Sequence, residues 1–310
     1  ATTEMQRIYA QPVREDLVAQ RIREIKEQGV VAAASLTPQR VRGLYETALD
    51  AGLDILVIQG TVISAEHVSI TSEPLNLKEF IREVPIPVVV GGCASYSTGL
   101  HLMRTGAVAV LVGVGPGAAC TTRGVLGIGV PQATAIADVQ AARSQHMLET
   151  GEYVKVIADG GMRNGGDVSK AFACGADAVM IGSPLARAYE APGQGFHWGM
   201  ATFHPSLPRG ARVKTTQNGS LEQILLGPAH ENDGTFNLMG SLRTSMATCG
   251  YEDIPSFHRA EVMVAPALQS EGKQLQREQG IGMGATRAAA AAPEAVTADN
   301  GGGPVGAPVA

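Results

Sequence analysis

The sequence predicts an α/β protein whose strands run parallel in one sheet. Six short runs of residues are almost entirely apolar, and segments with helical spacing separate them. Strands that are apolar on both faces are typical of a parallel sheet covered by helices. The predicted strands are residues 30–36, 54–59, 87–92, 108–113, 155–159 and 178–182.

Between these runs the chain repeats one local order of strand, loop and helix. Apolar residues from Val41 to Leu49 recur at the spacing of a buried helical face, and Gly52 follows as the expected C-terminal cap. The same order recurs where Val168 leads to Gly175 and then to the last run. Such a repeating unit is typical of parallel α/β folds.

Nearly every predicted strand ends in a polar or glycine-bearing turn, and this distribution favours one architecture. The turns are Ser35-Leu-Thr37, Gln59-Gly-Thr61, Gly91-Gly-Cys93, the loop 113–122, Asp159-Gly-Gly161 and Gly182-Ser183. A (β/α)8 barrel, or TIM barrel, takes ligand groups from the loops after many strands, whereas a doubly wound sheet gathers them at one switch point. Ser35-Leu-Thr-Pro38 also stands where a doubly wound dinucleotide-binding sheet would carry GxGxxG. We therefore expect the barrel.

The domain organisation follows from the number of units and from the composition of the tail. Six units predict a TIM barrel truncated at the N-terminus, with about two βα units missing. We expect this partial catalytic barrel over residues 1–284, including a C-terminal segment over 252–284. Residues 285–310 are rich in Ala, Gly and Pro with scarcely any large apolar side chain, which predicts a disordered tail.

Composition excludes several classes of protein. The chain has 310 residues, 45% hydrophobic content and a formal net charge of -5, with no cluster of Lys and Arg that would indicate nucleic acid or an anionic membrane. No apolar run approaches the roughly 20 residues of a membrane span. Cys93, Cys120, Cys174 and Cys249 are widely spaced, without the paired spacing of a zinc site. We expect a reducing, cytoplasmic setting.

The loop after the fourth predicted strand carries the clearest chemical signal. In Gly113-Val-Gly-Pro-Gly-Ala-Ala-Cys120-Thr-Thr122-Arg123, glycines at alternate positions allow a ligand to approach the backbone closely. A free cysteine is usually a small buried hydrophobe. Here backbone donors and the nearby cation of Arg123 favour the thiolate, so we predict a nucleophile at Cys120.

Two further turns add groups that suit a nucleotide. Asp159-Gly160-Gly161 ends one strand and Gly182-Ser183 ends the next. A carboxylate suits ribose hydroxyls, and glycine amides suit a phosphate. Each turn alone has a plain alternative, a simple turn or a helix cap. With a thiol one strand earlier, the set predicts a nucleoside monophosphate held with its base near Cys120.

These segments closely resemble the IMP dehydrogenase / GMP reductase family. The resemblance covers residues 6–284 and rests on the loop 113–122, Gly129-Val-Pro-Gln132, Ile157-Ala-Asp-Gly-Gly161, Gly175-Ala-Asp-Ala-Val-Met-Ile-Gly-Ser183 and Glu190-Ala-Pro-Gly193. Within the family, the chain resembles the IMP dehydrogenase-related branch. No CBS-type module separates the strands, and Gly195-Phe-His-Trp-Gly-Met-Ala201 replaces the usual segment with lysine and tyrosine.

The resemblance implies a role for each matching residue. Cys120 matches the nucleophile that attacks C2 of the purine, and Thr122 matches the threonine that handles water or ammonia. The implied substrate-binding residues are Ala118, Asp159, Gly160, Gly161, Gly182, Ser183, His197 and Met200. The implied cofactor-binding residues, for NAD, are Gln59, Gly60, Cys93 and Gly113. Carbonyls of Gly115, Gly117 and Cys120 match a K+ site, and the family implies a homotetramer.

The chain also departs from the family pattern. Ala118 stands where relatives have a phosphate-binding serine, and His197 stands where they have a tyrosine. Gln59 and Cys93 stand at the nicotinamide-side positions usually held by aspartate and asparagine. The long flap that activates water is reduced to a few residues, among which His204 is a candidate base.

The implied function is NAD-dependent oxidation of IMP to XMP through a covalent thioimidate on Cys120, a step toward GMP. Two alternatives stay open. GMP reductase chemistry, the NADPH-dependent deamination of GMP to IMP, uses the same cysteine and threonine. A non-catalytic purine nucleotide-binding protein is the other alternative, although binding alone needs no thiol.

Overall fold

The computed structural model describes residues 2–60, 74–199, 212–264 and 273–279. The chain divides into two compact units, Ala1–Val264 and Ala265–Ala310. The described part of the second unit contains helix α13 (Lys273–Glu278). The predicted tail, 285–310, lies outside the described residues. The sheet and the candidate site belong to the first unit.

The core of the first unit is a six-stranded parallel sheet in the order β1-β2-β3-β4-β5-β6. Its strands are β1 (Ala33–Leu36), β2 (Ile55–Gln59), β3 (Val88–Cys93), β4 (Ala109–Val112), β5 (Lys155–Asp159) and β6 (Ala178–Met180). Strands adjacent in the sequence are adjacent in the sheet, as in a barrel, and no switch point reverses the order. All six predicted strands and their parallel direction are confirmed.

The sheet is curled into a half-barrel. Gln59 at the end of β2 donates through Nε2 to Oδ2 of Asp159 at the end of β5, over 2.9 Å. Three strand spacings of about 4.8 Å would separate these strands in a flat sheet. The hydrogen bond therefore requires the two strands to face each other across a concave surface, and six parallel strands in sequence order curled in this way confirm the predicted (β/α)-barrel fold class.

Alternating residues of the strands form two apolar layers. Outward residues such as Ile58 of β2 and Val110 of β4 belong to the large core beneath the helices. Inward residues such as Val57 and Leu111 form a smaller cluster on the concave side. A strand covered on both faces needs apolar residues at every position, which explains the continuous apolar runs of the sequence.

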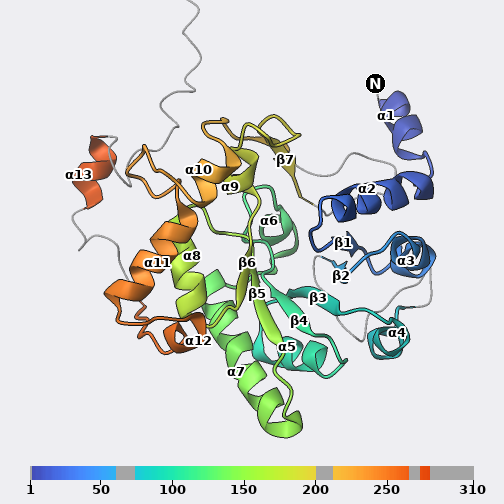
Figure 1. The fold of residues 1–310 in the computed structure, drawn as a ribbon, viewed down its shortest axis with the longest axis horizontal. Coiled ribbons are helices and arrows are strands. Elements are labelled where there is room, and N and C mark those ends of the chain that lie inside the picture. Colours follow the sequence, from blue (N-terminus) through green and yellow to red (C-terminus); the bar gives the residue numbers. More distant parts are fainter. Residues whose placement is uncertain (1, 61–73, 200–211, 265–272, 280–310) are drawn as a thin grey trace, which may run out of the picture. The chain divides into compact units, whose positions relative to one another are not determined.

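Helices line the outer side of the sheet, as Figure 1 shows for α3, α4, α5, α7 and α8. The helices of this unit are α1 (Thr2–Tyr9), α2 (Glu15–Glu27), α3 (Val41–Asp50), α4 (Leu77–Glu83), α5 (Tyr96–Met103), α6 (Thr122–Leu126), α7 (Gln132–Thr150), α8 (Gly165–Ala173), α9 (Ser183–Ala186), α10 (Leu221–Leu225), α11 (Leu238–Thr248) and α12 (Ile254–Phe257). A two-stranded antiparallel hairpin, β7 (Phe196–Trp198) and β8 (Arg212–Lys214), follows α9. None of the helices in the described ranges is long and apolar enough to cross a bilayer.

Local sequence explains where these helices begin and end. The side chains of Asn76, Ser95 and Asn164 each accept a hydrogen bond from the first turn of α4, α5 and α8. Helix α3 ends as predicted, because Gly52 has φ +92° and donates to the Leu49 carbonyl. These caps explain where α4, α5 and α8 begin and where α3 ends.

The first predicted strand, 30–36, is longer than the observed β1. Val30 and Val31 are exposed and precede the strand, and Asp54 instead accepts the amide of Ala32 through its carboxylate. Strand β1 has β2 as its only partner among the described residues. An edge strand makes hydrogen bonds to a neighbour on one side alone, so β1 begins at Ala33 and not at residue 30 as predicted.

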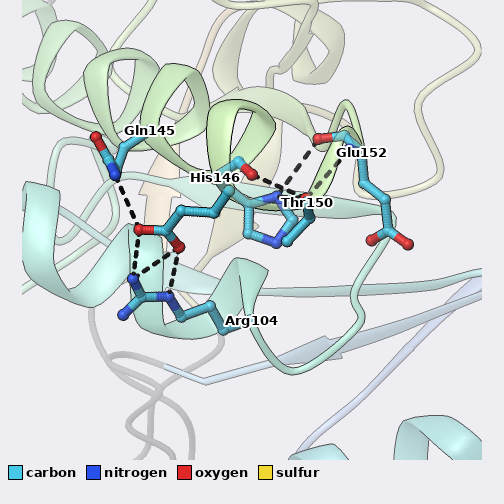
Figure 2. Close-up of polar contacts among 6 residues, drawn as sticks. Arg104, Gln145, His146, Thr150 and Glu152 are labelled. Atoms are coloured by element: carbon cyan, nitrogen blue, oxygen red, sulfur yellow. Dashed lines mark hydrogen bonds and ion pairs between the residues drawn. The ribbon is translucent and has the colours of Figure 1, made fainter.

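A polar cluster fastens the C-terminal end of α7 to α5 (Figure 2). Arg104 donates to both carboxylate oxygens of Glu149 at 2.8 Å. Buried His146 lies beside Thr150, whose hydroxyl donates to the His146 carbonyl at 2.8 Å and accepts the Glu152 amide at 3.1 Å. This cluster lies where α7 turns back into β5, at the end of the sheet opposite the carboxyl ends of the strands.

Candidate active site

The loops after β4, β5 and β6 meet at the carboxyl end of the sheet. Gly113 directly follows β4 with φ +149°, and a Cβ there would lie 2.2 Å from the Asp159 carbonyl oxygen. Gly161 has φ +83°, and its Cβ would lie 2.9 Å from Pro116 of the cysteine loop. Glycine is required at both positions, so that the turn after β5 can pack directly on the loop that carries Cys120.

Cys120 is half-buried at the end of this loop. Its Sγ lies 3.1 Å from Oγ1 of Thr122, and its amide donates to the Gly117 carbonyl at 3.1 Å. Thr122 is 4% exposed and begins α6. A threonine hydroxyl can accept from the thiol and donate to the thiolate. The pair can therefore support either protonation state of a nucleophilic sulfur.

Arg123 joins the cysteine loop to the segment at Val130 through its guanidinium. Its Nε donates to the Val114 carbonyl at 3.0 Å, and Nη2 donates to the Val130 carbonyl at 2.6 Å. A Cβ at Gly115 would lie 2.7 Å from Cγ of Arg123, so the guanidinium arm needs that glycine. Among the described residues, the hydrogen bonds of this guanidinium go to backbone oxygens, and the expectation that its charge favours the Cys120 thiolate stays a prediction.

Asp159 lies at the end of β5, facing the concave side of the sheet. Burial raises the pKa of its carboxyl to about 6, and the hydrogen bond from Gln59 opposes this rise. Among the described residues, its Oδ1 accepts no hydrogen bond and no cation pairs with it. A carboxylate with one free oxygen suits a ligand hydroxyl.

The positions expected at the cofactor are engaged within the protein. Both amide atoms of Gln59 make hydrogen bonds, to Ser35 and to Asp159. Cys93 is 1% exposed, its thiol donates to the Leu111 carbonyl, and burial raises the pKa of that thiol to about 12. The Cys93 side chain therefore does not reach a cofactor, which corrects that expectation for this side chain. It faces the outer core, because the register between β3 and β4 shifts just before it.

The two remaining cofactor positions are glycines whose amides close the ends of the strands. The Gly60 amide donates to the Gly91 carbonyl, and the Gly113 amide donates to the Cys93 carbonyl, each at 2.8 Å. Their role at a cofactor stays a prediction.

The expected phosphate end gathers residues from β6, α9 and β7. Ser183 Oγ lies 2.8 Å from Nε2 of His197, while Nδ1 of His197 is buried without a hydrogen-bond partner in the described part of the chain. Exposed Gly182 precedes Ser183, and Ala118 is exposed on the cysteine loop. A Cβ at Gly199 would lie 3.2 Å from the Ala119 carbonyl oxygen, which brings the end of β7 against that loop. Met200 and His204 lie outside the described residues.

A groove of about 490 Å³ runs beside His197, between α9 and β7. Its walls are mainly apolar and include Leu185, Ala188, Pro192, Phe196 and Trp198. No group of three or more His, Cys, Asp or Glu residues capable of holding a metal occurs in the described ranges.

Two residues of the site were not predicted with their roles. Ser35 belongs to a predicted turn, and in the structure it donates to Gln59, which in turn donates to Asp159. Gln132 ends the motif Gly129-Val-Pro-Gln132, and its Nε2 donates to the Val112 carbonyl at 2.6 Å and to the Asp159 carbonyl at 3.3 Å, joining the ends of β4 and β5. For Ser35 the sequence does carry a signal, because a polar residue stands at the end of a strand that is apolar on both faces. For Gln132 no local sequence signal indicates this role.

The fold and site define a parallel half-barrel with a threonine-supported cysteine at the carboxyl ends of its strands. The model of the IMP dehydrogenase / GMP reductase domain matches residues 3–274. The chain belongs to this family of oxidoreductases.

Several relatives support the same assignment. An uncharacterized oxidoreductase of Mycolicibacterium smegmatis is 50% identical over 264 residues, covering 84% of this chain and 70% of the relative. An inosine-5'-monophosphate dehydrogenase of Methanocaldococcus jannaschii is 33% identical, covering 79% of this chain and 53% of that protein. The crystal structure of an IMP dehydrogenase/GMP reductase-like protein from Corynebacterium glutamicum superposes with a TM-score of 0.78 at 47% identity, covering 86% of this chain and 70% of that one.

Proposed function

We propose that this protein oxidises IMP to XMP with NAD, through a covalent thioimidate on Cys120. The observation that carries the proposal is the 3.1 Å contact between Cys120 and Thr122, on a glycine loop packed against the Asp159 turn. A binding protein needs no such thiol. Family membership supports the reaction class, because one of the similar proteins is an inosine-5'-monophosphate dehydrogenase.

The proposed chemistry begins at the cysteine. The Cys120 thiolate adds to C2 of the hypoxanthine ring, and loss of a hydride from C2 leaves the thioimidate. When bound, NAD would supply the hydride acceptor. Water then adds to C2, the C–S bond breaks, and the sulfur leaves as thiolate with XMP as product. Thr122 is placed to exchange a proton with the sulfur and with the incoming water.

The remaining residues are proposed to hold the nucleotide. Asp159 would accept a ribose hydroxyl at its free Oδ1. The phosphate would lie against the turns of Gly160, Gly161, Gly182 and Ser183, with His197 in the place of the family's tyrosine. Ala118 provides no hydroxyl there. The contact between Nε2 of His197 and Ser183 Oγ at 2.8 Å supports this placement, and Nδ1 of His197 is buried without a hydrogen-bond partner among the described residues.

The residues implied for NAD and the residues implied for K+ suit their ligands to different degrees. For NAD, the amides of Gly60 and Gly113 already donate to backbone carbonyls, both amide atoms of Gln59 are engaged, and the Cys93 side chain is buried. For K+, the carbonyls of Gly115, Gly117 and Cys120 are hard oxygen ligands on one loop, and the Gly117 carbonyl already accepts the Cys120 amide. We propose that the same loop holds the cation, within a cytoplasmic homotetramer.

Steady-state assays of the full chain test the reaction. We expect reduction of NAD in the presence of IMP and no oxidation of NADPH in the presence of GMP. Oxidation of NADPH with GMP alone would assign the protein to reductase chemistry. Binding of IMP without either turnover would favour the non-catalytic alternative.

A further inference from the structure

A polar relay crosses the mouth of the half-barrel from β1 to β5. Ser35 Oγ donates to Oε1 of Gln59 at 3.2 Å, and Nε2 of Gln59 donates to Oδ2 of Asp159 at 2.9 Å. The hydrogen bond from Gln59 is the one that the Asp159 carboxylate accepts among the described residues. Three strands thus place one donor on one carboxylate oxygen.

The chemistry of the three groups fixes the direction of the relay. An ionised carboxylate only accepts hydrogen bonds, so the amide nitrogen of Gln59 must face Asp159. The amide oxygen then points to Ser35, whose hydroxyl is free to donate. Because both ends of the amide are held, Gln59 cannot rotate without losing a hydrogen bond.

We propose that Gln59, held by Ser35, is a positioning residue for Asp159 that occupies Oδ2 and presents Oδ1 to a ribose hydroxyl of the substrate. The identity of that ligand rests on the proposed function, whereas the effect on Asp159 does not. Gln59 then serves the substrate side of the site and not the cofactor side, because neither of its amide atoms is free.

The electrostatics around Asp159 support this role. Burial raises the pKa of the carboxyl, and the Gln59 hydrogen bond is the contact that lowers it. No charged side chain of the described residues pairs with Asp159, and the thioether of Met180 is the other group near Nε2. Removal of the Gln59 donor should therefore favour the protonated form, and a carboxylate at position 59 should favour it further.

The test combines carboxyl 13C NMR titration of the apo full chain with calorimetric titration of IMP at neutral pH. Gln59→Leu should raise the Asp159 midpoint by about one pH unit and weaken IMP binding about tenfold. Gln59→Glu, which keeps the side-chain shape, should raise the midpoint more, and Ser35→Ala less. Gln145→Leu, which removes a glutamine hydrogen bond to Glu149 at the far end of the sheet, is the matched control and should change neither quantity. The KM for NAD should stay unchanged in Gln59→Leu.

The outcomes separate the two proposals. An Asp159 midpoint unchanged in both Gln59 variants overturns the relay, whether or not IMP binds. A shifted midpoint in a chain that never binds IMP retains the positioning role and refutes the proposed function. A shifted midpoint with unchanged IMP affinity refutes the presentation of Oδ1 to the ligand.

Discussion

At the scale of single residues, Asp159 shows an opposition between folding and binding. Burial raises the pKa of this carboxyl from 3.8 to about 6, so the folded state binds its proton more tightly than the unfolded state does. The stabilisation of the folded state by the protonated Asp159 carboxyl is complete below about pH 4 and is lost as the pH rises through about 6. At neutral pH the ionised Asp159 carboxylate therefore weakens the fold, and it is this form that the proposed contact with a ribose hydroxyl would use.

Asp159→Asn should reverse this effect. The neutral amide removes the cost of burying a charge, so the free energy of unfolding should rise by about 1 to 3 kcal/mol near pH 7.5 and change little near pH 4. Denaturant unfolding at both pH values measures the difference, and equal effects at the two would contradict the assignment. IMP binding by this variant should be weak at either pH.

Cys120 is the proposed nucleophile. Cys120→Ser should lower turnover at least about a thousandfold while IMP affinity changes little, because the fold and the nucleotide contacts remain. The exposed Cys249 offers a matched control, and Cys249→Ser should retain full activity. Comparable losses in the two variants would refute a specific role for Cys120.

At the scale of elements, the cysteine loop depends on Arg123. Arg123→Ala removes two hydrogen bonds to backbone carbonyls and should cost about 1 to 3 kcal/mol of stability, together with a lower kcat. Arg243→Ala, on the exposed face of α11, should be neutral. Thermal unfolding with parallel assays measures both effects. A stable Arg123 variant with full kcat would show that the loop holds its shape by other contacts.

The junction of α7, β5 and β6 contains a buried ion pair. Arg143 Nη1 lies 2.7 Å from Oδ2 of Asp177, which also accepts the Val156 amide, while Oδ1 accepts the Tyr153 hydroxyl. Asp177→Ala leaves the buried guanidinium unpaired and should destabilise the protein by about 3 to 5 kcal/mol. The exposed pair of Arg104 and Glu149 is the comparison, and Glu149→Ala should cost less than about 1 kcal/mol. Similar costs, read from denaturant unfolding, would contradict the burial argument.

Much of the fold was predictable because its signals are local. Apolar runs covered on both faces defined the six strands, and helical spacing with glycine caps defined α3 and α8. The loop of Cys120 was predictable because its glycines and thiol are contiguous. The relay from Gln59 to Asp159 was not, since 100 residues separate them and their contact depends on the curl of the sheet. The orientation of Arg123 likewise depends on where the chain returns at Val130.

At the scale of the whole molecule, β1 and β6 each have one strand partner among the described residues. Edge strands with unpaired backbone groups favour pairing with another polypeptide segment. If the chain forms the proposed homotetramer, it should sediment as a species with about four times the 32.1 kDa mass of one chain. Velocity sedimentation of the full chain should show this species, and a lone monomer boundary over the accessible concentrations would exclude the tetramer.

Intact-protein mass spectrometry of the chain mixed with IMP and NAD tests the covalent chemistry most directly. We predict an acid-stable mass increase of one nucleotide that maps to Cys120, depends on both ligands and is missing from Cys120→Ser. Steady turnover of IMP with no adduct on Cys120 at any time point, or with an adduct on another cysteine, would contradict sulfur catalysis at this loop.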